Sequence, residues 1–187
     1  VVVGNYCTWN PLDKGGTITL ANGNLEATGN SSPGYGSVRG TIAISSGKFY
    51  FEATAISANG ADIGITNANV VFGANGIPDY SNTAIIYSFT SGSGIFINST
   101  TLTYATNFSN NDIVGVAFDQ TNKKIWFAVN NVWQGTGTQD PATNQGGYTY
   151  ANISNATPYF DDGAGASIPS IAANFGQRPF AYTAPSG

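Results

Sequence analysis

Short runs of β-branched and aromatic residues, each bounded by glycine, asparagine or serine, recur along the chain and constrain its fold more than any other feature. The most regular run is residues 48–56, in which Phe49, Phe51, Ala53 and Ala55 occupy alternate positions. A period of two places these side chains on one face of a strand. Helical periodicity is almost absent. The pattern therefore predicts an all-β chain that folds as a sandwich or barrel.

The same criteria predict strands along most of the chain, and its 187 residues fit one domain, residues 1–187. Asn22-Gly23 and Asn130-Asn131 mark two hairpin turns, because Asn and Gly tolerate the left-handed backbone of a tight turn. The mostly apolar run 112–119 suits a central position in a sheet. The expected strands are residues 17–20, 24–28, 37–44, 48–56, 61–66, 83–89, 93–98, 112–119, 124–129, 132–135, 148–153, 157–160 and 168–175.

Composition excludes several classes of partner and chemistry. Only 9% of residues are charged and the net charge is −4, with no basic cluster beyond Lys123-Lys124. We therefore expect no nucleic-acid binding, and the absence of any long apolar run predicts no membrane insertion. The chain has no histidine and one cysteine, which excludes Ser-His-Asp catalysis and Cys/His zinc sites. Cys7 is interpreted as a small buried apolar residue.

Carboxylates are the remaining source of catalysis or metal binding. A glycosidase needs two paired carboxyl groups, and nothing in the spacing pairs Glu26 with Glu52. Glu52 lies in the middle of an expected strand, which predicts a hydrogen-bonded, partly buried carboxyl group. Asp161 and Asp162 are candidate Ca²⁺ ligands, but a tight acidic turn between strands is the favoured interpretation. We expect no enzyme and no cofactor, with Ca²⁺ as the one alternative.

An ordered set of motifs runs through residues 47–52, 63–65, 112–119, 125–131 and 159–160. This order resembles the SPRY (B30.2-like) domain family. In that family two central strands read roughly as D-x-V/I-G-x-x-x-D and L-x-F-x-x-N-G. Asn131 stands where the family usually has glycine. Both ends of the chain, Asn5–Leu12 and Ala173–Phe180, are similar to SPRY-like domains of tailed-phage and other viral structural proteins.

The resemblance implies a concanavalin A-like jelly roll, a sandwich of two antiparallel sheets. It also implies a virion or extracellular module that was cut from a longer structural protein, such as a tail fibre, spike or capsid decoration. Its partners would be a host surface glycan or protein, or other virion proteins. The alternatives are a cellular SPRY-type adaptor that binds peptides, and a structural subunit that forms homo-oligomers through its sheet edges. A carbohydrate-processing enzyme is a distant fourth.

Aromatic side chains in loops and on exposed strand faces are the candidate ligand contacts, because they stack on sugars and anchor peptides. The alternative is that each ring caps an end of the core, which is the stronger interpretation for Trp9 and Trp126. Arg178 is expected to tie the tail to a carboxylate. The candidate binding residues are Tyr35, Phe72, Tyr80, Trp133, Tyr148 and Tyr150.

Overall fold

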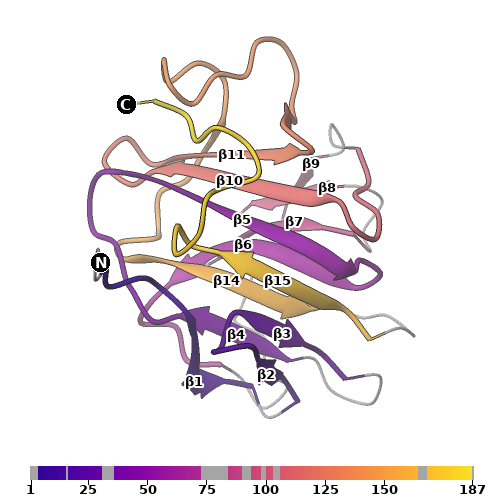
Figure 1. Cartoon of the computed structure of the whole chain (residues 1–187). Coiled ribbons are helices and arrows are strands. Elements are labelled where there is room, and N and C mark those ends of the chain that lie inside the picture. The colour runs from indigo at the N-terminus through magenta and orange to yellow at the C-terminus, as the bar shows by residue number, and fades with distance from the viewer. Residues whose placement is uncertain are drawn as a thin grey trace.

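The computed structural model shows two antiparallel β-sheets packed face to face, and no helix occurs among the residues that it describes (Figure 1). No segment of this described part is therefore a helix that could cross a membrane. The predicted all-β sandwich is confirmed. The described residues are 4–15, 17–30, 36–72, 84–89, 94–97, 100–102, 106–163 and 168–186.

One sheet has seven strands, and all of its neighbouring pairs are antiparallel. Its three central strands, residues 156–162, 61–67 and 84–88, contain Ile, Tyr and Phe, which suit the pleated surface of a strand. In spatial order the strands are β1 (Trp9–Lys14), β4 (Ser37–Gly40), β14 (Ala156–Asp162), β6 (Ala61–Asn67), β7 (Ala84–Ser88), β8 (Gly94–Ile97) and β9 (Thr100–Leu102).

The second sheet has eight strands, also antiparallel, and it carries the candidate site described below. Its path runs through β12 (Val132–Trp133), β11 (Lys124–Val129), β10 (Ile113–Asp119), β5 (Lys48–Ser57), β15 (Ser170–Asn174), β3 (Glu26–Thr28) and β2 (Thr19–Ala21), and β13 (Tyr148–Thr149) pairs with β11 off this path. The run predicted to be central, 112–119, is β10, and it lies between β11 and β5.

The hairpin turns form where asparagine predicts them. Asn130 and Asn131 have φ angles of 47° and 68°, so both central residues of the β11–β12 turn are left-handed. This is the backbone of a type I′ turn, which matches the twist of the two strands. Asn22 and Gly23 have φ angles of 50° and 67° in the turn between β2 and β3.

The hydrophobic core lies between the sheets. Phe51, Val116 and Phe127 lie opposite one another on three neighbouring strands of the eight-stranded sheet, and all three are buried. Trp9 is fully buried in this core, with its ring 5.1 Å from the Phe175 ring. Burying each such side chain stabilises the fold by roughly 1.5–3 kcal/mol.

Several local expectations are also decided by the structure. Cys7 is buried, as predicted, and burial raises the pKa of its thiol. Phe49 shares the strand face of Phe51, but it lies at the end of the sheet and is 43% exposed. Strands β1 and β9 were not predicted, and the strand expected at 148–153 is shorter, ending at Thr149.

The expected acidic turn at Asp161 and Asp162 is wrong. Both residues lie within β14, both are buried, and Asp161 lies opposite Asp62 on β6. The strand continues because Oδ2 of the Asp161 carboxyl group accepts hydrogen bonds from Ser37 and Tyr159. Burial, and then the neighbouring Asp161 carboxyl group, raise the pKa of Asp62 well above its ordinary value. The described residues contain no cluster of three or more His, Cys, Asp or Glu suited to a metal.

Candidate binding groove

A row of three side chains crosses the outer face of the eight-stranded sheet. Ala117 on β10 lies opposite Tyr50 on β5 and opposite Trp126 on β11. Residues directly opposite one another share a face of the sheet, and the neighbouring Val116 points into the core. The row therefore faces away from the core. A methyl group between two large rings leaves a hollow at the centre of this row.

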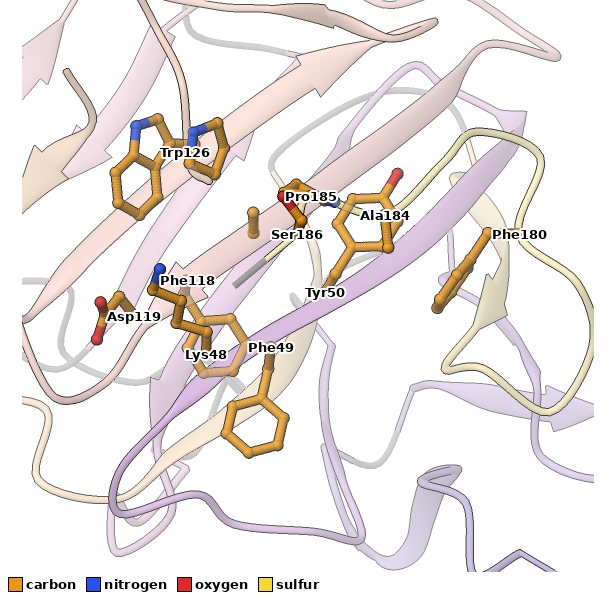
Figure 2. Close-up of a pocket in the computed structure, with 12 residues that line it drawn as sticks. Lys48, Phe49, Tyr50, Phe118, Asp119, Trp126, Phe180, Ala184, Pro185 and Ser186 are labelled. Carbon is orange, nitrogen blue, oxygen red and sulfur yellow. The ribbon is translucent and has the colours of Figure 1, made fainter. Parts of the chain in front are cut away.

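The hollow has a volume of about 280 Å³. The end of the chain forms one side of it: Phe180, Pro185 and Ser186 lie beside the row, as Figure 2 shows. The complete lining is Lys48, Phe49, Tyr50, Ala117, Phe118, Asp119, Trp126, Pro141, Phe180, Ala184, Pro185 and Ser186.

A second hollow of about 200 Å³ adjoins the first, because Phe49, Tyr50 and Phe118 line both. The rings of Phe49 and Phe118 are stacked with their centroids 5.7 Å apart, and Phe49 is exposed. Together the two hollows are named the aromatic groove. The second hollow is lined by Asn5, Tyr6, Cys7, Ile42, Ile44, Phe49, Tyr50, Phe51, Phe118, Pro158 and Phe175.

Charge in the aromatic groove is confined to one end, where Lys48 lies opposite Asp119. Burial acts to raise the pKa of the Asp119 carboxyl group, but hydrogen bonds donated by Asn122 outweigh it, and the pKa lies below its ordinary value. Asp119 is therefore an anion at neutral pH, matched by the ammonium group of Lys48. The rest of the groove is apolar and aromatic, which favours apolar and aromatic ligand groups.

Glu52 holds the end of the chain beside the groove. Its carboxyl group accepts hydrogen bonds from the backbone N–H groups of Ala181 at 2.8 Å and Tyr182 at 2.9 Å, and from the Tyr50 hydroxyl at 3.1 Å. Glu52 is only 3% exposed. The predicted hydrogen-bonded carboxyl group is confirmed. Burial, and then the Glu52 carboxyl group, raise the pKa of the Tyr50 hydroxyl, so this hydroxyl stays protonated and donates.

The expectation for Arg178 is corrected. Arg178 is exposed, and no described carboxylate lies within ion-pair distance of it. The end of the chain is tied to a carboxylate, but the donors are backbone amides and the acceptor is Glu52. The ion pair among the described residues is Arg39 with Asp13, at 2.6 Å.

The candidate rings from the sequence do not gather in one place. Trp133 is half-buried and lies beside the groove, its ring centroid 6.5 Å from that of Tyr50. Phe72 lies under the Arg39 guanidinium group, 4.5 Å from it, and is packed against the seven-stranded sheet.

Tyr148 is half-buried and packs on the core. Tyr150 is buried and donates a hydrogen bond to Gln120 at 2.7 Å, so its ring belongs to the core. Tyr35 and Tyr80 lie outside the described residues. The ligand-binding role of these six residues stays a prediction.

Sequence reasoning missed the residues that form the groove, chiefly Tyr50, Ala117 and Phe180. The period of two does place Tyr50 on the face opposite Phe51. The pairing register aligns Tyr50 with Ala117 and Trp126, and it cannot be derived from the sequence of one strand. Phe180 follows the last strand in an irregular segment, where periodicity carries no information.

Many solved structures match this chain and share its architecture, among them two SPRY domains and a toxin. The SPRY domain of human HERC1 has a TM-score of 0.68 at 15% identity, covering 91% of this chain and 99% of that one. The TRIM65 PSpry domain has a TM-score of 0.67 at 11% identity, covering 91% and 90%. Stonustoxin has a TM-score of 0.63 at 16% identity, covering 91% of this chain and 27% of the toxin. Identities this low establish a shared fold alone.

Sequence comparison identifies the family itself. No curated protein matches the chain significantly. The profile of the SPRY domain matches residues 48–160, which is more than half of the chain and runs from the start of β5 into β14. SPRY domains mediate protein–protein interactions and are generally non-catalytic. The sequence motifs, the two-sheet architecture and the profile agree, and the chain belongs to the SPRY domain family.

Proposed function

We propose that this chain is a non-enzymatic binding module that holds an extended segment of a partner protein in the aromatic groove. The observation that carries the proposal is the Tyr50–Ala117–Trp126 row on the outer face of the sheet, with its hollow of about 280 Å³. A hollow of this size accepts one large apolar or aromatic side chain. The adjoining second hollow accepts another, so an extended peptide would fill both.

The chemistry of the groove favours a peptide over a sugar. Its lining is mostly aromatic rings, proline and alanine, and Lys48 and Asp119 are its only charged residues in the described part of the chain. Sugars need many polar groups along a site, whereas peptide anchors are apolar or aromatic side chains with a few polar contacts. The C-terminal segment of the chain is itself bound to this face of the sheet as a peptide would be, because the Glu52 carboxyl group accepts hydrogen bonds from two successive backbone N–H groups.

The proposed setting is a viral particle, in which the domain is part of a tail fibre, spike or capsid decoration. This part of the proposal is supported by the resemblance of residues 5–12 and 173–180 to phage structural proteins. Its partner would be a host surface protein or another virion protein. Mass spectrometry of purified particles tests the setting, and absence of the chain from every particle preparation would leave the cellular adaptor as the better proposal.

Peptide display on the wild-type chain tests the binding function. A library of random peptides, about 12 residues long, should yield binders with apolar or aromatic anchors. Ala117→Leu fills the hollow from its floor and should weaken these peptides by about tenfold or more. Ala43→Leu is the matched control, because Ala43 is exposed and does not line the groove.

Two outcomes would overturn the proposal. One is a set of peptides that bind Ala117→Leu as tightly as the wild type. The other is a library that yields no binder while a glycan array yields one, which would indicate a carbohydrate-binding module.

A further inference from the structure

The C-terminal tail, residues 178–186, crosses the outer face of the eight-stranded sheet without forming a strand, and is the yellow segment after β15 in Figure 1. Four described contacts hold its first half. Glu52 accepts two backbone N–H groups, Asn174 Nδ2 donates to the Pro179 carbonyl at 3.1 Å, and the Phe180 ring lies 5.0 Å from the Tyr50 ring.

Glu52 is an unusual residue to bury in this position. It lies in the middle of β5, and no described cation is within ion-pair distance of its carboxyl group. A buried carboxyl group costs free energy unless hydrogen bonds replace its water. Two of its three donors are tail amides, so the burial of Glu52 and the position of the tail depend on each other.

The tail in turn completes the first hollow. Phe180, Ala184, Pro185 and Ser186 line it, and Figure 2 shows Pro185 and Ser186 between Trp126 and Tyr50. Without the tail, the row on the sheet would have a floor and no wall on that side. Glu52 itself is absent from the lining, so it would act on a ligand only through the tail.

We propose that Glu52 is the positioning residue of the aromatic groove, because it docks the C-terminal tail as the wall against which a partner segment binds. The binding consequence rests on the proposed function. The docking itself does not, and it is testable on the chain alone.

Hydrogen exchange of the tail amides, measured by NMR on the full chain, tests the docking. In the wild type the Ala181 and Tyr182 amides should be protected. In Glu52→Gln one of the two acceptor oxygens becomes an NH₂ group that faces a backbone donor, and both amides should exchange about tenfold faster or more. Glu26→Gln on β3 is the matched control, and it should leave both amides protected. Protection of Val116 in β10 shows that each variant is folded.

A soluble paramagnetic agent tests the wall. In the wild type Ala117 is only 4% exposed and its methyl group should be shielded, whereas Glu52→Gln should broaden the signal of that methyl group. Amides that stay protected in Glu52→Gln would overturn the docking. Amides that exchange freely while the Ala117 methyl stays shielded would overturn the role of the tail as a wall.

The displayed peptides give the third readout. Glu52→Gln should weaken the peptides selected on the wild type by about tenfold, although it leaves every lining residue unchanged. Unchanged or tighter binding would overturn the inference, and tighter binding would show that the tail competes with the peptide. A library that yields no binder counts against the proposed function alone, because the exchange and shielding measurements need no partner.

Discussion

Gly64 lies where strands β6 and β7 approach too closely for any side chain, and Gly64→Ala should therefore destabilise the domain strongly. A Cβ atom at this position would lie 1.9 Å from the Ile85 carbonyl oxygen, and real Cβ contacts are not shorter than 3.0 Å. Gly115 in β10 is the matched control. Its Cβ would lie 2.9 Å from the Tyr50 hydroxyl, which is the far end of a side chain and can rotate away.

The magnitude follows from the shift that Gly64→Ala requires. The strands must separate locally by at least the difference between 3.0 and 1.9 Å, and the obstacle is backbone in a paired strand. Losing about two ladder hydrogen bonds costs roughly 2 kcal/mol, and overpacking costs roughly 1–3 kcal/mol more. We expect Gly64→Ala to lower the free energy of unfolding by about 3–5 kcal/mol. For a chain of this size that lowers Tm by about 10 °C.

Thermal unfolding followed by circular dichroism, together with urea titration, measures both variants. Gly115→Ala should stay within about 1 kcal/mol of the wild type, because the loss of chain flexibility in the unfolded state offsets the small shift of Tyr50. A Gly64→Ala variant that melts within about 2 °C of the wild type would refute the reasoning. It would mean that β6 and β7 can separate at little cost.

Three further predictions concern buried groups. The pKa of the Asp62 carboxyl group is raised in the folded state. The protonated carboxyl group therefore stabilises the fold at pH values below the ordinary pKa of Asp, and this stabilisation is lost as the pH rises through the raised pKa of the folded state. The urea midpoint should fall as pH rises above about 4, and Asp62→Asn should flatten this dependence; an equal slope in the variant would contradict it. Trp126→Phe loses the Nε1–H hydrogen bond to the Gln145 carbonyl at 2.8 Å and should cost about 2–4 kcal/mol in urea unfolding, whereas a loss under about 1 kcal/mol would count against it. Cys7 lines the second hollow but is only 8% exposed, and burial raises the pKa of its thiol, so it should react with a disulfide reagent more slowly than a free cysteine; labelling at the rate of free cysteine would contradict this.

The fold was predictable because local sequence patterns determine most of its strands and turns. Period-two alternation identified β5, apolar runs identified β10 and β14, and paired asparagines identified the β11–β12 turn. The ordered motifs resembled the SPRY family, to which the chain belongs. Strand β1 was not predicted because Trp9–Lys14 contains proline, asparagine and two charged residues, which are poor strand formers away from a sheet edge.

The candidate site was harder to predict, because it depends on which strands become neighbours. Ala117 has no special signal in the sequence, and it becomes the floor of a hollow only when Tyr50 and Trp126 flank it. The expected acidic turn was wrong for the same reason. Asp161 continues a strand because Ser37, more than 100 residues earlier in the sequence, lies opposite and donates to it. Tyr148 and Tyr150 were expected to alternate on one strand face, but the strand ends at Thr149 and Tyr150 is buried.

Mapping a displayed peptide onto the wild-type chain by NMR tests the central claim most directly. If the aromatic groove is the binding site, the largest shifts will occur at Ala117, the Trp126 indole N–H and Phe180. Shifts concentrated instead around Phe72 on the seven-stranded sheet, with Ala117 unperturbed, would contradict the account.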